Sequence, residues 1–87
     1  MVEMVIRVSN PTGLHARPAA LFVQIAGKFT SSVWIGKGEK KVNAKSIMGL
    51  MSLSISQGNE ISICADGEDE HLAIRELVDF IESGFIE

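Results

Sequence analysis

Cysteine is almost absent from this sequence, which has Cys64 alone among its 87 residues. A single cysteine excludes an internal disulfide framework and a zinc site built from several thiolates. Long apolar runs are missing as well, and Glu3 and Arg7 interrupt the apolar residues of the first eight positions. That pattern lacks the features of a signal peptide or a membrane span. We therefore expect a cytoplasmic protein with no targeting segment and no membrane insertion.

Basic residues are too few for a nucleic-acid-binding surface. Eight lysines and arginines stand against eleven acidic residues, which gives a net charge of -3, whereas binding to a phosphate backbone needs a basic stripe. One local cluster is formed by Lys37, Lys40, Lys41 and Lys45. Two interpretations of it are open: a solvated hairpin edge that discourages strand addition, or positive charge around a phosphorylation site. Neither makes nucleic acid an expected partner.

Apolar residues are abundant enough for one core. They make up 46% of the chain, which suits a single domain covering residues 1–87. Four segments alternate apolar and polar residues at the period of a half-buried strand, namely 3–8, 32–36, 41–43 and 61–66. Met4, Ile6 and Val8 form the expected buried face of the first strand, and Cys64 is expected on the open side of the sheet with Ser62. A tight turn at 37–40 predicts a hairpin.

Three segments have the period of a helix. The first begins at Ala16 and ends at Gly27, the second is short and follows Ser46 as its N-cap, and the third follows the acidic residues 66–70 and ends at Gly84. Their expected core positions are Ala19, Phe22, Val23 and Ala26 in the first and Ala73, Ile74, Leu77 and Ile81 in the last. The order β-α-β-β-α-β-α predicts an α+β protein of two layers, with the helices covering one side of a mainly antiparallel sheet.

Chemistry-bearing residues converge at the start of the first helix, in Gly13-Leu14-His15-Ala16-Arg17-Pro18. Pro18 is tolerated only in a first helical turn, which places His15 at or near the N-cap. That position offers free backbone N–H groups and the positive end of the helix dipole to an anion. Positive charge nearby also favours the unprotonated, nucleophilic imidazole, while Arg17 can bind phosphoryl oxygens. A capping or solvated histidine is the alternative that these residues alone leave open.

Two motifs resemble a known family. Gly13-Leu14-His15-Ala16-Arg17-Pro18-Ala19 resembles the active-site signature of the histidine phosphocarrier proteins, the HPr family, and Lys45-Ser46-Ile47-Met48-Gly49-Leu50-Met51 resembles the segment around that family's regulatory serine. The resemblance covers essentially the whole chain. It implies an open-faced β-sandwich, with four antiparallel strands in spatial order 1-4-2-3 and three helices on one face.

The same resemblance implies an activity. Enzyme I of the bacterial sugar phosphotransferase system, charged by phosphoenolpyruvate, would pass a phosphoryl group to Nδ1 of His15, and His15 would pass it to sugar-specific enzyme IIA domains. The protein would then be a stoichiometric carrier rather than an enzyme, with Arg17 stabilising the phosphoryl group. A bifunctional HPr kinase and phosphorylase would modify Ser46, and a catabolite-control transcription regulator would be a further partner. We expect a monomer with no metal and no cofactor.

A surface for these partners is predicted beside the two motifs. Ala20, Leu21 and Gln24 lie opposite the core face of the first helix, and Ile47, Met48 and Met51 would border them if the two helices are neighbours. Flexible apolar methionines suit a protein that binds several partners. Packing of Ile47 and Met51 into the core is equally compatible with the pattern. His71, among acidic residues, is expected to be a solvated residue without a partner.

Two other functions remain open. The first is a purely regulatory module that acts through Ser46, although the resemblance implies that such relatives lack the histidine. The second is the nitrogen-related branch of phosphocarriers, against which the Ser46 motif argues. An autonomous enzyme is disfavoured, because no second acid, base or metal cluster accompanies His15.

Overall fold

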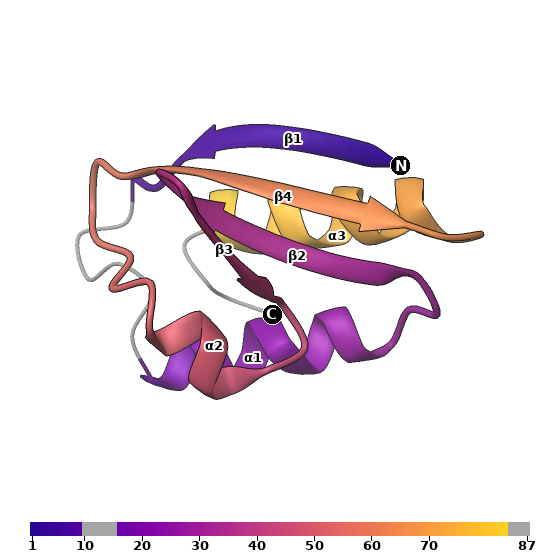
Figure 1. Ribbon diagram of the computed structural model, residues 1–87, viewed down its shortest axis with the longest axis horizontal. Coiled ribbons are helices and arrows are strands. Elements are labelled where there is room, and N and C mark those ends of the chain that lie inside the picture. Colours follow the sequence, from indigo (N-terminus) through magenta and orange to yellow (C-terminus); the bar gives the residue numbers. More distant parts are fainter. Residues whose placement is uncertain (10–15, 84–87) are drawn as a thin grey trace.

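A computed structural model describes residues 1–9 and 16–83, without the side chains of residues 16 and 17. These residues form two layers, a sheet and a set of helices packed on one of its faces (Figure 1). None of the helices formed by the described residues lies on the other face of the sheet. The strands are β1 (Val2–Arg7), β2 (Ser32–Lys37), β3 (Lys40–Asn43) and β4 (Glu60–Asp66), and the helices are α1 (Ala16–Gly27), α2 (Ile47–Met51) and α3 (Glu70–Glu82).

The sheet has the strand order β1-β4-β2-β3, and all its pairs are antiparallel. Strands β2 and β3 form a hairpin in which Lys37 pairs with Lys40. Gly38 in the connecting turn has a φ of 62°, a left-handed conformation that glycine adopts without steric cost. The element order, the spatial order of the strands and the single helical layer confirm the predicted open-faced sandwich.

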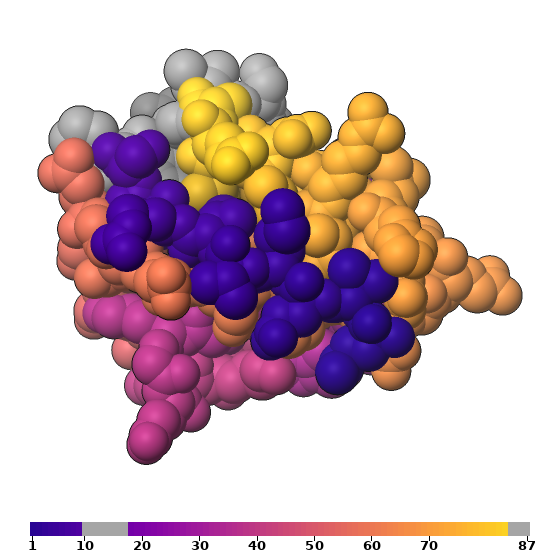
Figure 2. Space-filling view, turned by 90° about the horizontal axis from the view of Figure 1, so that it is seen from above, coloured from indigo at the N-terminus to yellow at the C-terminus, as the bar shows by residue number. Residues whose placement is uncertain are grey.

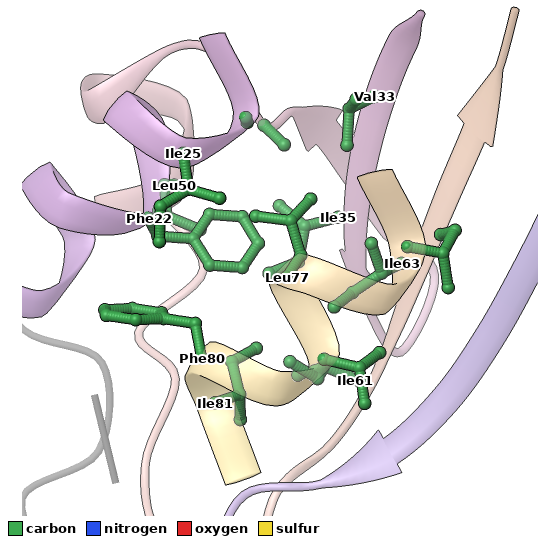
Figure 3. Packing of buried hydrophobic residues seen from close by; sticks show 14 of the residues in the cluster. Phe22, Ile25, Val33, Ile35, Leu50, Ile61, Ile63, Leu77, Phe80 and Ile81 are labelled. Atoms are coloured by element: carbon green, nitrogen blue, oxygen red, sulfur yellow. The ribbon is translucent and has the colours of Figure 1, made fainter. Parts of the chain in front are cut away.

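The core lies between the helices and the covered face of the sheet. Figure 3 shows isoleucines of β2 and β4 directed toward Phe22 of α1 and Leu77 of α3. The rings of Phe22 and Phe80 are 6.4 Å apart between centroids, a separation typical of attractive aromatic pairs. Helix α2 contributes Leu50, which is 1% exposed. All three helices are therefore fixed by apolar side chains inserted into one core.

Three details differ from the sequence predictions, and a fourth, the end of the last helix, is not tested. Met4 is 45% exposed, because β1 is an edge strand and Met4 lines an open groove beside α3. Val78 and Phe80 of α3 are buried in addition to the predicted positions. Helix α3 ends at Glu82, and Gly84, the predicted stop, lies outside the described residues. His71 is exposed as predicted, but its Nε2 lies 3.8 Å from Glu70 Oε2, a contact that is an ion pair only when the imidazole is protonated.

Cys64 is on the predicted face of β4 but is only 1% exposed. The strand is central, so Glu3 of β1 and Trp34 of β2 flank the cysteine as cross-strand neighbours. The Cys64 thiol donates a hydrogen bond to Glu3 Oε2 at 3.0 Å. Burial and this hydrogen bond raise the pKa of the thiol, so Cys64 stays protonated and lacks the thiolate character that nucleophilic cysteines need.

Asp69, just before α3, ties this helix to the segment that follows α1. Its carboxylate accepts hydrogen bonds from the backbone N–H of Thr30 at 2.9 Å, from the backbone N–H of Ser31 at 3.0 Å, and from the Ser31 hydroxyl. Ser31 itself is 1% exposed. The Ser31 hydroxyl, followed by the Thr30 N–H, lowers the pKa of Asp69 from 3.8 to about 2. The ionised form of Asp69 is therefore the one that the fold prefers.

This preference predicts a particular acid sensitivity. Because folding lowers the pKa of Asp69, its contribution to stability is complete above pH 3.8 and is lost as the pH falls through about 2. The variant Asp69→Asn should have a shallower dependence of unfolding free energy on pH across that interval, measured by denaturant unfolding at a series of pH values. Glu39→Gln, at an exposed position in the turn between β2 and β3, is the control that removes a carboxylate elsewhere. Parallel pH profiles for wild type and Asp69→Asn would contradict the prediction.

Candidate functional site

The candidate phosphoryl site is at the start of α1. This helix begins at Ala16, and Pro18 is buried in its first turn, which agrees with the predicted helix start. His15 lies outside the described residues, and the Arg17 side chain is not described either. The sequence nonetheless places His15 immediately before the first residue of the helix. Backbone N–H groups of a first helical turn have no partner inside their helix, so this end of α1 is suited to an anion.

Ser46 is the N-cap of α2, as predicted. Its Oγ accepts a hydrogen bond from the backbone N–H of Gly49 at 3.2 Å, while its carbonyl accepts one from Leu50 N at 3.0 Å. Its backbone is extended, with φ of -115° and ψ of 116°, as is usual for an N-cap. The residue is half-buried. A phosphate on this hydroxyl would lie at a helix N-terminus, where negative charge is tolerated.

The surface that follows Ser46 along α2 is apolar. Helix α2 exposes 42% of Ile47, 82% of Met48 and 40% of Met51 and inserts only Leu50 into the core. Core packing of Ile47 and Met51, which the sequence left open, is therefore excluded. Helices α1 and α2 lie next to each other (Figure 1). On α1, Gln24 is exposed, whereas Ala20 and Leu21 are half-buried. We call Ala20, Leu21, Gln24, Ile47, Met48 and Met51 the α1–α2 surface.

The lysines that the sequence marked as a cluster have a role that neither interpretation included. Lys37 Nζ donates to the carbonyls of Leu53 at 3.1 Å and Ser54 at 2.9 Å, and Lys40 Nζ donates to Ser52 O at 3.2 Å. These three consecutive carbonyls follow the end of α2, where cations are favoured. We call Lys37 and Lys40 the lysine clasp. The two lysines are thus neither simply solvated nor directed at a phosphoryl group.

Lys45 is also engaged with the backbone. Its Nζ donates to Phe29 O at 2.8 Å, which connects the residue before the N-cap of α2 with the segment after α1. Lys45 therefore stabilises the relative position of the two helices that carry the α1–α2 surface.

Among residues 1–9 and 16–83, no group of three or more His, Cys, Asp or Glu side chains is arranged to hold a metal ion. No helix in the same residues is long and apolar enough to cross a membrane.

Comparison with known proteins gives the family. The family described as the PTS HPr component phosphorylation site matches residues 2–83. The chain belongs to this HPr family. The HPr-like protein Crh of Bacillus subtilis is 55% identical over 94% of this chain and 96% of its own length. The phosphocarrier protein HPr of Neisseria meningitidis serogroup A is 45% identical over 98% of this chain and 96% of its own length.

Solved structures agree with this assignment. The crystal structure of an HPr from Thermoanaerobacter tengcongensis has a TM-score of 0.95 and 62% identity, covering 100% of this chain and 98% of that one. HPr proteins are phosphocarriers of the phosphotransferase system, and the predicted family and fold are confirmed.

One prediction about assembly does not fit the relatives. A crystal structure of Bacillus subtilis Crh, 52% identical with a TM-score of 0.77 and full coverage of both chains, is described as a dimer with a swapped domain. The expectation of a monomer is therefore not supported.

Proposed function

We propose that this protein carries a phosphoryl group on His15, accepting it from enzyme I and passing it to sugar-specific enzyme IIA domains, with regulatory phosphorylation at Ser46. One observation supports this most strongly. The sequence His15-Ala16-Arg17-Pro18 stands at the start of α1 in a chain whose family is defined by a phosphorylation site.

The chemistry follows from the position of these residues. An unprotonated ring nitrogen of His15 attacks the phosphorus of the donor, and the donor's own bond to phosphorus breaks as the new P–N bond forms. The N–H groups of the first turn of α1 and the Arg17 guanidinium stabilise the phosphoryl oxygens. The P–N bond is labile enough for transfer to the next acceptor. No cofactor is needed, and the protein is consumed and regenerated as a reactant.

The α1–α2 surface is proposed as the shared docking site of the partners. Enzyme I and the enzyme IIA domains must reach His15, which precedes α1 in the sequence, and the exposed side chains of Ile47, Met48 and Met51 offer an adaptable apolar area next to α1. Enzyme I, enzyme IIA domains, the Ser46 kinase and phosphorylase, and a catabolite-control transcription regulator would use this surface one at a time.

A purely regulatory role is the second candidate. Two relatives named HPr-like protein Crh are 55% and 57% identical to this chain. His15 argues against that role as the sole one, because a module that works only through Ser46 needs no histidine here. The nitrogen-related phosphocarrier branch is a third candidate, disfavoured by the Ser46 motif.

The deciding experiment is incubation of the protein with enzyme I and phosphoenolpyruvate, followed by mapping of acid-labile phosphate. Label on the peptide containing His15, and its onward transfer to an enzyme IIA domain of the sugar system, supports the proposal. Absence of label, together with phosphorylation of Ser46 by an HPr kinase, would favour the regulatory module. Transfer to the nitrogen-related relay alone would favour the third candidate.

Arg17→Ala should slow phosphoryl transfer without loss of stability. A charge-assisted hydrogen bond to the phosphoryl group is worth about 1.5–3 kcal/mol, so its removal is expected to lower the transfer rate by at least about tenfold. Rapid-quench kinetics with enzyme I measure the change. Lys28→Ala is the control, because Lys28 is an exposed cation beyond the opposite end of α1. An unaltered rate for Arg17→Ala would remove Arg17 from the proposed mechanism.

Ser46→Asp should weaken binding to enzyme I while leaving the fold intact. The added negative charge lies next to Ile47 and opposes a partner that approaches with apolar or acidic groups, so KM is expected to rise by a few-fold, most strongly at low salt. The melting temperature should change little, because an acid is tolerated at a helix N-terminus.

Two controls separate the Ser46 effect from general ones. Ser46→Ala removes the capping oxygen without adding charge, and Ser56→Asp adds the same charge at an exposed loop position. Both should leave KM near the wild-type value. If KM of Ser46→Asp is unchanged at low ionic strength, Ser46 is a helix cap without an electrostatic role in regulation.

A further inference from the structure

The face formed by β1 and α3 has a groove that the proposed function does not use. It has a volume of about 340 Å³. Its apolar lining comes from Val2 and Met4 of β1 and from Ile74 and Val78 of α3. The Met4 side chain was predicted to be buried, but it is 45% exposed and lines this groove. Figure 2 shows β1 in indigo running beside α3 in orange and yellow on this face. The groove is therefore an apolar surface that the described residues leave uncovered.

Charged residues border the groove in a regular order. Along α3 the polar side chains of the lining are His71, Arg75, Asp79 and Glu82, whose spacing places them on one stripe of the helix. The basic side chains occupy the N-terminal half of the stripe and the acidic ones the C-terminal half. Within residues 1–9 and 16–83, Arg75, Asp79 and Glu82 form no ion pair. These three charged side chains are therefore available to pair with charges on a partner.

This order of charges along α3 is complementary to the same order on a second α3 that runs in the opposite direction. If a second copy of α3 lies antiparallel to the first, Arg75 faces Asp79 of the second copy, and His71 faces its Glu82. Both pairs are centred on the same turn of the helix, at residues 76–77, so one two-fold axis satisfies them together, as an isologous interface requires. A parallel arrangement would instead place like charges together. We propose that two copies of this chain associate through the β1–α3 groove, with Arg75 and Asp79 as the reciprocal central pair.

The location is compatible with partner binding at the other side of the molecule. In Figure 1, β1 lies at the opposite side of the sheet from β3 and α2. Leu72 of α3, 49% exposed, adds apolar surface near the groove. We expect the association to be weak and to depend on protein concentration.

Sedimentation equilibrium with four proteins tests the charge pairing. Wild type should show a reversible monomer–dimer equilibrium at concentrations up to about 1 mM at low salt. Arg75→Asp and Asp79→Arg should each raise the dissociation constant by at least about tenfold, since each brings like charges together across the axis. The double variant with both changes restores opposite charges in the reversed order, so it should dimerise nearly as well as wild type.

Two further measurements make the test specific. Met4→Ser should weaken the dimer, and circular dichroism melting of every variant shows whether the monomer remains folded. The proposal is wrong if wild type stays monomeric over the whole concentration range. It is also wrong if a dimer forms whose stability the single charge reversals leave unchanged, as expected for a dimer made by exchange of a chain segment. Failure of the double variant to recover, with both single variants folded, would likewise overturn the reciprocal pairing.

Discussion

His15→Ala is expected to abolish phosphoryl acceptance from enzyme I completely. The methyl side chain of alanine has no lone pair to attack phosphorus, and no neighbouring group in the motif replaces the ring nitrogen. The fold should be unaffected, because His15 belongs to none of the apolar faces that the sequence assigns to the core. Substitutions outside a core change stability by about 0.5 kcal/mol or less, which corresponds to a shift in melting temperature of about 4 °C or less for a domain of this size.

The measurement is transfer of phosphate from labelled phosphoenolpyruvate through enzyme I, with a thermal melt on the same sample. Acid-labile phosphate on the variant, whether at His71 or elsewhere, would show that His15 is not the acceptor. If the variant loses all label but also shows no cooperative melting transition, the loss is explained by unfolding of the variant. His15→Asn, which keeps a polar side chain of similar size at the helix start, then separates the chemical role from any capping role.

Gly67→Ala is expected to be the most destabilising of the substitutions considered. Gly67 has a φ of 156°, a backbone conformation that residues with a side chain rarely adopt. A β-carbon at this position would lie 2.7 Å from Ser31 Cα and 2.5 Å from Ser31 Oγ. Ser31 cannot retreat easily, because it is buried and its N–H and hydroxyl both bind Asp69. Overpacking and backbone strain together should cost about 3 kcal/mol.

A loss of that size should lower the melting temperature by roughly 10–20 °C in a domain of this length. Gly27→Ala is the matched control, since a β-carbon at the end of α1 would meet nothing within 4 Å. Its melting temperature should stay near the wild-type value. If Gly67→Ala melts within a few degrees of wild type, the contact with Ser31 is more yielding than the structure indicates.

Most of the fold could be predicted because its local signals agree with one another. Alternation identified β2 and β4, and the helical period identified α1 and α3 within a few residues of their observed ends. The failures have a common origin in tertiary placement. Alternation assigns a face to Met4 or Cys64, but whether that face is covered depends on which strand is central and which lies at the edge.

The sequence predicted the chemical residues of the candidate site better than the contacts that hold α2 in place. The capping role of Ser46 follows from its residue type and position before an apolar segment. The lysine clasp could not be predicted, because Lys37 and Ser54 are 17 residues apart and only the packing of the hairpin against α2 brings them together. The exposure of Ile47 and Met51 was equally undetermined, since a five-residue helix has too few positions for periodicity to identify its buried side.

The lysine clasp has a consequence for how the α1–α2 surface can change in evolution. Helix α2 is held by Ser46 at its start, by Leu50 beneath, and by Lys37 and Lys40 beyond its end. Its outward residues, Met48 above all, take almost no part in keeping it folded. Recognition and folding are thus assigned to different side chains of the same short segment. Substitutions at Met48 can therefore alter the choice of partner while leaving the scaffold intact, which allows the binding preferences of such a carrier to diverge between lineages at little risk to its stability.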